Sequence, residues 1–438
     1  MTNPISFNLN FQKFENSINI SLPAGLHVIY GESGSGKSQF IYSLSGLKDR
    51  KESNFIFSNI VIPEFFQIVF QNPENQILSH TLKSELAFAL ECQTINPQEL
   101  QEKLTLLQSN FPFIRDWDRH PETLSGGQME MLNLVTAFST NPQLVFIDDG
   151  LSFLNDDSKK NWVDWIRNKI SRGKVVLWFT SDPTDLAFGD TKWELSLSGF
   201  RSLDTMPDLN RYSYRHPKGD LTIKFNDLLF SYSKSDYPVI DNWNCDISHA
   251  RSIGLIGKNG KGKTTLSKLI TGLILPEKGD IQIELKKKVP RIATLDQFPE
   301  RMLGADPLVS LVSDLVVNQK MNSRLVNKCI NRLYKYQINW EIIKDQSALD
   351  IPWSTLRLAL IIILGHSEYD VLILDEPTFG LGWKQKMSLS RFFQEILVNK
   401  YLILISHDKV FVSDHCDYIY DIDAQIATRN KTVLINEK

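Results

Sequence analysis

Short apolar runs punctuate the chain at similar places in its two halves. They are LHVIYG, LVFIDD and VVLWFTS in the first half and SIGLIG, VLILDE and YLILISH in the second. Runs of this length are typical of strands buried on both faces, as in a parallel sheet covered by helices. Residues 75–120 and 300–350 carry apolar residues at helical spacing and predict helical insertions between the sheet segments. The pattern therefore predicts an α/β fold.

An internal repeat organises this pattern. The segments GESGSGKS at 31–38 and GKNGKGKT at 257–264 both match GxxxxGK[ST], and their lysines are 226 residues apart. Other landmarks recur at nearly the same offset: Gln71 with Gln297, Asp148 with Asp375, and Ser181 with His407. Since this period is far longer than that of a solenoid repeat, each copy is expected to be a whole domain. We place the first domain at 1–205, a polar linker at 206–219, and the second domain at 220–438.

Composition changes this picture little. The 438 residues are 42% apolar and 23% charged with a net charge of −3, so no basic surface for nucleic acid is indicated. The start of the chain does not resemble a signal peptide, and no apolar run reaches the about 18 residues that a membrane span needs. The cysteines have no CxxC spacing and are expected to be buried, reduced thiols, which fits a cytosolic protein. They are Cys92, Cys245, Cys329 and Cys416.

The two glycine-rich segments carry the clearest chemistry. A strand, a glycine-rich loop and a helix that begins at Lys-Ser or Lys-Thr would direct backbone N–H groups at phosphates. Lys37 and Lys263 are expected to reach the β- and γ-phosphates of a nucleotide, and Ser38 and Thr264 to ligate Mg²⁺. The expected binding residues are Gly31, Glu32, Ser33, Gly34, Ser35, Gly36, Lys37 and Ser38 in the first loop and Gly257, Lys258, Asn259, Gly260, Lys261, Gly262, Lys263, Thr264 and Thr265 in the second.

The strands LVFIDD and VLILDE end in acidic residues. Asp148 and Asp375 lie 111 and 112 residues after the loop lysines, and each is expected to hold Mg²⁺ through water. The expected metal site then contains Ser38, Gln71 and Asp148 in the first copy and Thr264, Gln297 and Asp375 in the second.

The sequence LSGGQ at 124–128 resembles the signature of the ATP-binding cassette superfamily. Its serine hydroxyl and glycine amides at a helix start would form a second anion site, made of Ser125, Gly126, Gly127 and Gln128. The resemblance implies two P-loop ATPase domains, each with a mainly parallel sheet core, a helical subdomain and an antiparallel β part. It also implies head-to-tail pairing, expected within one chain, so that each ATP contacts the loop of one copy and the signature of the other. Tyr232 looks like the aromatic residue that stacks on adenine, with a core tyrosine as the alternative.

The two copies differ at the hydrolytic positions. The second has Asp375-Glu376-Pro377-Thr378 and Ile405-Ser406-His407-Asp408, which match the family's catalytic glutamate and switch histidine. The first has Asp148-Asp149-Gly150 and Thr180-Ser181-Asp182 there. Counting back 23 residues from Asp148 and Asp375 sets SGGQ against Pro352-Trp353-Ser354-Thr355. Proline removes an N–H and tryptophan crowds the approach of a phosphate, so this signature is expected to be lost.

Pairing the copies concentrates the losses in one site. The second loop with the first signature has every part, with Asp375, Glu376, His407 and Gln297 as its catalytic residues. The first loop would face the altered signature, and its Asp149 is one methylene shorter than glutamate. A displacement of about 1 Å can lower a rate about 10²-fold. We therefore expect one efficient ATP site and one slow site; random decay is the alternative.

The segment VFQNPENQILSHTLKSELAFALE resembles the ATPases of energy-coupling factor importers of vitamins and metal ions. Gln71, Asn72, Pro73, Glu74, Asn75 and Gln76 carry this likeness, and Gln297, Pro299 and Glu300 match it more loosely. It implies integral membrane subunits that contact the segments after Gln71 and Gln297, no nucleic acid, and a peripheral place on the cytoplasmic face of the membrane. The alternatives are that these residues cap a helix, that the protein acts on ribosomes or nucleic acid, or that it is the fused ATPase of a sugar importer.

Overall fold

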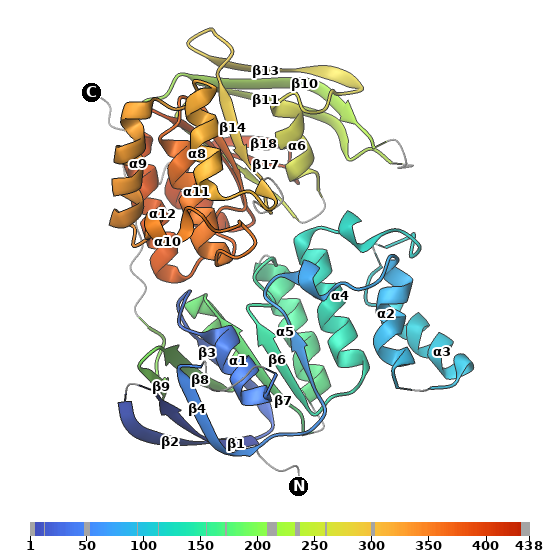
Figure 1. Cartoon of the computed structure of the whole chain (residues 1–438). Helices are drawn as coiled ribbons and strands as arrows, with labels where there is room; N and C mark the ends of the chain where they lie inside the picture. The colour runs from blue at the N-terminus through green and yellow to red at the C-terminus, as the bar shows by residue number, and fades with distance from the viewer. Residues whose placement is uncertain are drawn as a thin grey trace. The chain divides into compact units, whose positions relative to one another are not determined.

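The chain divides into two compact units, Met1–Leu209 and Asn210–Lys438 (Figure 1). The computed structural model describes residues 5–12, 14–47, 53–93, 95–112, 114–154, 156–170, 173–207, 217–232, 237–258, 261–298 and 303–430. The predicted linker straddles the division between the units, and its residues 208–216 lie outside the described part of the chain.

Unit 1 is built on a six-stranded sheet in the order β5-β6-β7-β3-β8-β9. Its strands are β3 (Gly25–Tyr30), β5 (Phe66–Val69), β6 (Leu144–Asp148), β7 (Val175–Thr180), β8 (Thr191–Ser196) and β9 (Gly199–Ser202). All neighbours are parallel except β8 and β9. Every residue of β3, β6 and β7 is buried, which explains their uninterrupted apolar runs. The predicted parallel core is confirmed.

A second, antiparallel sheet in unit 1 has the order β2-β1-β4. It contains β1 (Ile5–Phe11), β2 (Phe14–Leu22) and β4 (Phe55–Val61). Residues of β1 alternate between buried and half-buried because one face packs on the core. On that face Phe7 and Phe57 contact the ring of Phe40 edge to face at 5.9 and 5.0 Å, and Phe40 belongs to α1 (Lys37–Ser45). This packing fixes the helix that follows the first phosphate loop.

The remaining helices of unit 1 lie largely in the predicted insertion and around the main sheet. They are η2 (Pro73–Gln76), α2 (Leu82–Glu91), α3 (Pro97–Gln108), η3 (Pro121–Thr123), α4 (Gly126–Ser139), α5 (Asp156–Ile170) and η4 (Pro183–Phe188). Helix α2 packs on both α3 and α4 (Figure 1). The helical insertion at 75–120 is confirmed. One thiol expected to be buried is exposed, because Cys92 is the C-cap residue of α2 and projects from the helix end.

Unit 2 repeats this architecture. Its main sheet has the order β14-β15-β16-β12-β17-β18, and its antiparallel sheet the order β11-β10-β13. The strands are β10 (Leu221–Phe230), β11 (Ile240–Ala250), β12 (Ser252–Ile256), β13 (Lys278–Leu285), β14 (Ile292–Leu295), β15 (Val371–Asp375), β16 (Tyr401–Ile405), β17 (Tyr418–Asp421) and β18 (Ile426–Arg429). Both sheets therefore have the same strand order as their counterparts in unit 1.

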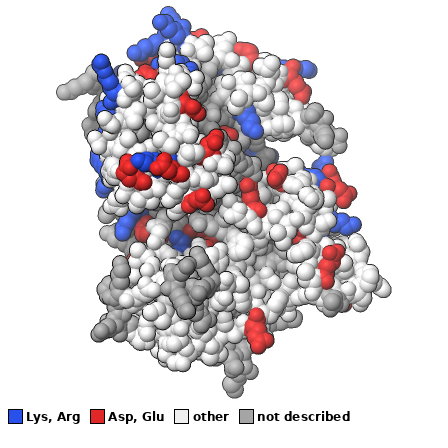
Figure 2. All heavy atoms as spheres, in the orientation of Figure 1, with Lys and Arg blue, Asp and Glu red and all other residues white. Residues whose placement is uncertain are grey.

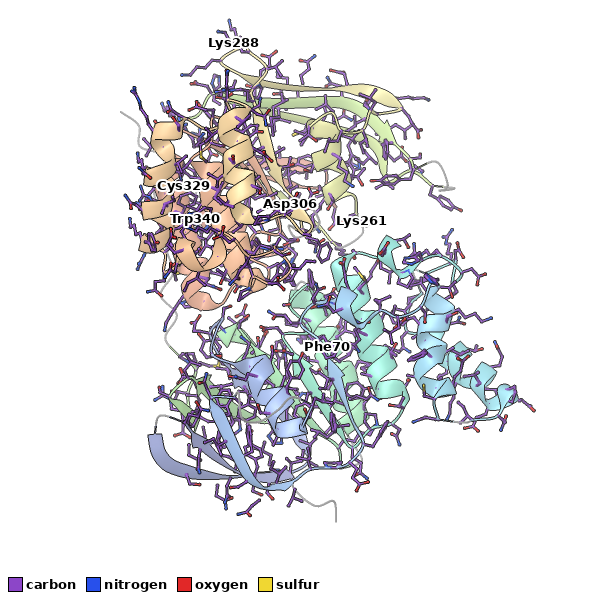
Figure 3. The ribbon with its side chains drawn as sticks, in the orientation of Figure 1. Phe70, Lys261, Lys288, Asp306, Cys329 and Trp340 are labelled. Carbon is purple, nitrogen blue, oxygen red and sulfur yellow. The ribbon has the colours of Figure 1, made fainter. Side chains whose placement is uncertain are left out.

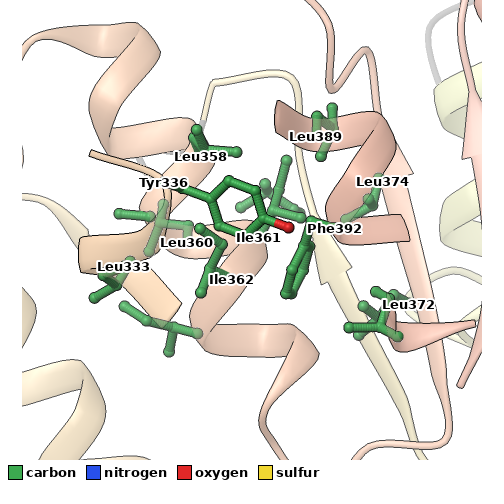
Figure 4. Close-up of a cluster of buried hydrophobic side chains, with 14 of the residues drawn as sticks. Leu333, Tyr336, Leu358, Leu360, Ile361, Ile362, Leu372, Leu374, Leu389 and Phe392 are labelled. Carbon is green, nitrogen blue, oxygen red and sulfur yellow. The ribbon is translucent and has the colours of Figure 1, made fainter. Parts of the chain in front are cut away.

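The helices of unit 2 pack into two cores, and all of them except α6 share the larger one. They are α6 (Lys263–Ile270), α8 (Leu308–Val317), α9 (Ser323–Lys335), α10 (Trp340–Ile343), α11 (Trp353–Gly365), α12 (Trp383–Ile396) and α13 (Lys409–His415). Figure 4 shows Ile362 of α11 among Leu333 of α9 and Phe392 of α12, all fully buried. Cys329 and Trp340, labelled in Figure 3, belong to the same core. Helix α11 is therefore held from several sides.

The face shown in Figure 2 gives little indication of a partner by charge. On the face of the described residues that Figure 2 shows, acidic and basic side chains are interspersed among uncharged ones. Among the described residues, none of the helices is both long and apolar enough to span a bilayer.

Candidate functional site

The first phosphate loop joins β3 to α1. Gly34 and Gly36 have φ of +83° and +90°, a region that side chains with a Cβ rarely adopt. A Cβ on Gly36 would also lie 2.9 Å from the ring of Phe55. Glycine at these positions lets the chain turn tightly and begin α1 at Lys37, so that free N–H groups of the helix start face the loop.

The second loop joins β12 to α6 in the same way. Gly262 has φ of +86° and precedes the first helical residue, Lys263. The exposed Lys261 lies just before α6 (Figure 3). The predicted contacts Asn259 and Gly260 lie outside the described residues.

Both loop lysines are buried and fold back over their loops. Lys37 Nζ donates to the carbonyl oxygen of Gly31 at 2.9 Å, and Lys263 Nζ donates to those of Gly257 and Lys258 at 2.8 and 3.2 Å. Such an ammonium group is placed to meet phosphate oxygens that enter the loop. Lys37 also forms an ion pair with Asp149 Oδ2 at 3.4 Å.

The hydroxyl groups that follow the lysines contact the aspartates at the ends of β6 and β15. Ser38 donates to Asp148, and Thr264 Oγ1 donates to Asp375 Oδ2 at 2.6 Å. These pairs lie 110 and 111 residues apart in sequence. The two motifs that the sequence pairs in each copy are thus joined by a direct hydrogen bond.

These hydroxyl and carboxylate pairs fit Mg²⁺, which prefers oxygen ligands. Within the described part of the chain, Asp148 Oδ1 is buried without a hydrogen-bond partner, and a hydrated cation would satisfy it. Burial and then the Asp149 carboxylate raise the pKa of Asp148 to about 6, although Ser38 and Lys37 lower it. Burial and then Glu376 raise the pKa of Asp375 to about 7. A metal ion bound beside each aspartate would supply the positive charge that stabilises the ionised carboxylate.

Glu376 lies at the centre of a polar cluster in unit 2. Its carboxylate accepts hydrogen bonds from the Ser406 hydroxyl at 2.9 Å and the His407 backbone N–H at 3.0 Å. His407 Nδ1 also lies 2.9 Å from Glu376 Oε2. Burial raises the pKa of Glu376, but the contacts with His407, Lys263 and Ser406 together lower it more, so the pKa lies below its ordinary value. The carboxylate is ionised and fixed in place, as a group that polarises water requires.

Asp149 occupies the equivalent position in unit 1. Strand pairing sets Asp148 opposite Phe179 and Asp375 opposite Ile405, so Ser181 stands where unit 2 has His407. Asp149 accepts from the Ser181 backbone N–H at 2.6 Å and from Gln71 Nε2 at 3.4 Å. Its carboxylate thus binds the loop lysine and the glutamine, in place of the histidine and serine side chains that hold Glu376.

The signature sequence forms the start of α4. Ser125 is the N-cap residue, with Gly126 and Gly127 as the first helical residues. The Gln128 N–H donates to Ser125 Oγ at 3.4 Å, and the Ser125 N–H donates to Gln128 Oε1 at 3.1 Å. This capping box orients the helix start where an anion would bind.

Pro352 is the N-cap residue of α11, so it takes the place that Ser125 has on α4. It provides no side-chain cap. The next residue, Trp353, stacks on Phe298 with ring centroids 6.0 Å apart and contacts Phe379 edge to face at 4.5 Å. An indole therefore stands where the first signature has glycine.

Of the other predicted site residues, Tyr232 lies beside α6 and Gln297 contacts α11. The hydroxyl of Tyr232 lies 3.3 Å from Thr265 Oγ1, beside the start of α6, and its side chain is 44% exposed. That exposure contradicts the core alternative. The backbone carbonyl of Gln297 accepts a hydrogen bond from Arg357.

Two charged residues near the site were not predicted from the sequence. Glu130 on α4 and Arg357 on α11 are both fully buried, and each lies five residues after its N-cap. A single charge inside the apolar runs that follow the signature positions was the signal that could have identified them.

The chain matches one protein family twice. The sequence profile of the ABC transporter family covers residues 16–152 and 240–379. A provisionally named ABC transporter ATP-binding protein of Methanosarcina mazei is 22% identical, over 92% of this chain and 88% of that protein. The provisionally named HMP/thiamine import ATP-binding protein YkoD of Bacillus subtilis is 22% identical, over 90% of this chain and 83% of that protein.

Solved structures share the fold. The structure described as ribosome-bound archaeal Pelota and ABCE1 superposes with a TM-score of 0.65 and 18% identity, covering 91% of this chain and 72% of that chain. The structure titled RNase-L Inhibitor has a TM-score of 0.59 and 16% identity, over 96% and 88%. At these identities the likeness shows the fold alone.

Proposed function

Because this chain belongs to the ABC transporter family and is an ATPase with two tandem cassettes, we propose that it energises a membrane importer through one efficient ATP site. The importer is of the energy-coupling factor type and carries a vitamin or a metal ion. The observation that carries the one-site assignment is the difference between the Glu376–His407 pair and its counterpart, Asp149 with Ser181.

Hydrolysis is assigned to the second phosphate loop. Phosphoryl transfer to water depends on positioning and on charge stabilisation. Mg²⁺ held near Thr264 and Asp375 would supply positive charge to the phosphates. The ionised Glu376, fixed by Ser406 and His407, orients the attacking water and accepts its proton. Lys263 holds the γ-phosphate, and Tyr232 stacks on the adenine.

The family resemblance implies head-to-tail pairing of the cassettes, and in that arrangement the intact signature of unit 1 would complete the second loop. Ser125, Gly126 and Gly127 then bind the γ-phosphate from the opposite side. In the same arrangement the first loop would face Pro352 and Trp353, which offer no glycine amides for this contact. ATP in the first loop therefore acts as a latch that turns over slowly.

Steady-state ATPase turnover of two variants tests this assignment. Glu376→Gln is expected to abolish turnover, because the amide cannot accept a proton from water. Asp149→Asn is expected to leave most turnover in place. Loss of hydrolysis in Asp149→Asn alone would contradict the assignment.

Importer coupling rests on the segment after Gln71. Asn72 caps η2 by accepting from the Glu74 N–H at 3.0 Å, and Asn133 Nδ2 on α4 donates to the Pro73 carbonyl at 2.8 Å. These bonds agree with a capping role and also make the segment rigid. Leu78, just beyond it, is 68% exposed, and Phe88 on α2 is 45% exposed, so each of these elements presents an apolar side chain to solvent. A helix of a membrane subunit would bury such surface. The import function in the name of the Bacillus subtilis relative agrees with this proposal.

Co-purification from detergent-solubilised membranes tests the coupling. Leu78→Asp is expected to remove the co-purifying membrane subunit and to retain basal ATPase activity. Leu106→Asp, on α3 and 70% exposed, is the matched control and is expected to retain both. Recovery of the wild-type chain with ribosomes in place of a membrane subunit would contradict the importer.

A further inference from the structure

The residues that replace the signature in unit 2 form an ordered aromatic cluster. Trp353 stacks on Phe298 with an interplanar angle of 6°, and Phe298 directly follows Gln297. The same indole contacts Phe379, which lies three residues beyond Glu376. The start of α11 therefore touches both the loop that carries Gln297 and the loop that carries Glu376.

Arg357, one turn further along α11, joins the same two loops by hydrogen bonds. One terminal nitrogen of its guanidinium donates to the backbone carbonyl of Glu376, and the other donates to that of Gln297. The guanidinium carbon lies 4.9 Å from the Trp353 ring centre and 5.4 Å from that of Phe379. A fully buried charge is tolerated only when it has such partners.

Unit 1 provides an internal comparison. At the same helical position, Glu130 accepts from the backbone N–H groups of Ser152 and Phe153, both at 3.0 Å. Both partners lie in the loop after β6. Glu130 thus accepts hydrogen bonds from the N–H groups of one loop, whereas Arg357 donates hydrogen bonds to the carbonyl groups of two loops. The bridge between two loops is therefore found in unit 2, the unit that also contains the glutamate and the histidine of the proposed efficient site.

We propose that Arg357 is a positioning residue that couples the Gln297 loop to Glu376 and thereby sets the rate of hydrolysis in unit 2. Displacement of the Gln297 backbone then moves the Glu376 backbone through a single rigid guanidinium. The stacked rings of Trp353 and Phe298 hold that guanidinium in position. The altered signature thus serves a mechanical function in place of phosphate binding. This inference rests on the proposed role of Glu376.

Arg357→Lys in the full chain tests the coupling. Lysine keeps the positive charge but has no planar fork to bridge two carbonyl groups. We expect kcat to fall about ten- to a hundredfold, with the KM for ATP within about twofold of the wild-type value. Amide hydrogen exchange should rise in both 296–298 and 376–379. Ile362→Val, which removes one buried methylene from the same helix, is the control and should change neither kcat nor this exchange.

The outcomes separate this inference from the proposed function. Turnover that survives in Glu376→Gln overturns the hydrolytic site and this inference with it. Turnover lost in Glu376→Gln but unchanged in Arg357→Lys, with only a lower Tm, overturns the inference alone. If Arg357→Lys does not fold, Phe298→Leu breaks the ring stack without removing a buried charge. A severalfold fall in its kcat at constant KM supports the coupling, and an unchanged kcat overturns it.

Discussion

Glu376 and Asp149 show how one methylene group redirects a carboxylate. Their backbones are alike, because each N–H donates at 2.8 Å to the neighbouring strand, to Ile405 in one case and to Phe179 in the other. Glu376 reaches the Ser406 hydroxyl and the His407 ring, whereas Asp149 contacts Lys37 and Gln71. Both carboxylates accept the backbone N–H of the switch position, so the units differ in the side chains that the carboxylate contacts.

The Ser406 hydroxyl is expected to contribute to catalysis through Glu376. Ser406→Ala removes a hydrogen bond to a charged group, a contact that contributes about 1.5–3 kcal/mol. We expect kcat to fall about tenfold or more with little change in KM, measured by steady-state ATPase assay. Thr180→Val is the matched control, because Thr180 donates to Asp185 in unit 1 and not to Asp149. A normal kcat in Ser406→Ala would refute this role.

Helices α4 and α11 are equivalent elements with different starts. Helix α4 begins with a capping box and two glycines, and α11 begins with proline and a stacked tryptophan. Behind these starts both helices are almost wholly buried, and each carries one charged residue that binds backbone groups of a loop. Each helix therefore orders the loop that follows its neighbouring strand, β6 or β15.

Glu130→Gln is expected to loosen the loop after β6. One carboxylate oxygen would become an NH₂ group that faces a backbone N–H, and a buried donor without an acceptor costs about 1–3 kcal/mol. Hydrogen exchange of the Ser152 and Phe153 amides should become faster by about tenfold or more. Glu122→Gln, whose side chain is 75% exposed, serves as the control. Unchanged protection in Glu130→Gln would rule out this anchoring.

The elements and the phosphate loops were predictable because their signals are local. A buried strand requires a run of apolar residues, and a phosphate loop requires glycines at fixed spacing before Lys37 or Lys263. The bond from Arg357 to Gln297 spans 60 residues, so no local pattern shows it. Burial of Cys92 was predicted wrongly because composition does not reveal that a helix ends there in solvent.

At the scale of the whole molecule, the two units keep one topology and differ in a few side chains. Each main sheet has the same strand order, and each loop lysine folds back onto its own loop. The differences cluster at Asp149, Ser181 and the start of α11, all of which belong to the proposed slow site. On the proposed assignment, the duplicated fold separates the binding of ATP from its hydrolysis without any change in architecture.

Lys37→Ala tests the proposed latch. It removes the ammonium group that would meet the phosphates in the first loop, so we expect weaker ATP binding and less ATP-dependent closing of the two units. Closing can be followed as ATP-dependent protection from proteolysis, and kcat at saturating ATP should fall less than the closing does. Lys263→Ala is the matched variant and should abolish turnover. Unchanged nucleotide binding in Lys37→Ala would refute the latch.

Both carboxylate residues also carry backbone strain. Glu376 and Asp149 have φ of +47° and +50°, a conformation that costs a residue with a Cβ about 1–3 kcal/mol. Aspartate adopts this left-handed region more readily than glutamate. The shorter carboxylate of unit 1 therefore stands on a backbone of the same shape at a lower cost in strain. On the proposed assignment, the slow site accepts this less strained residue, whereas the efficient site in unit 2 keeps the more strained glutamate because its chemistry needs the longer side chain.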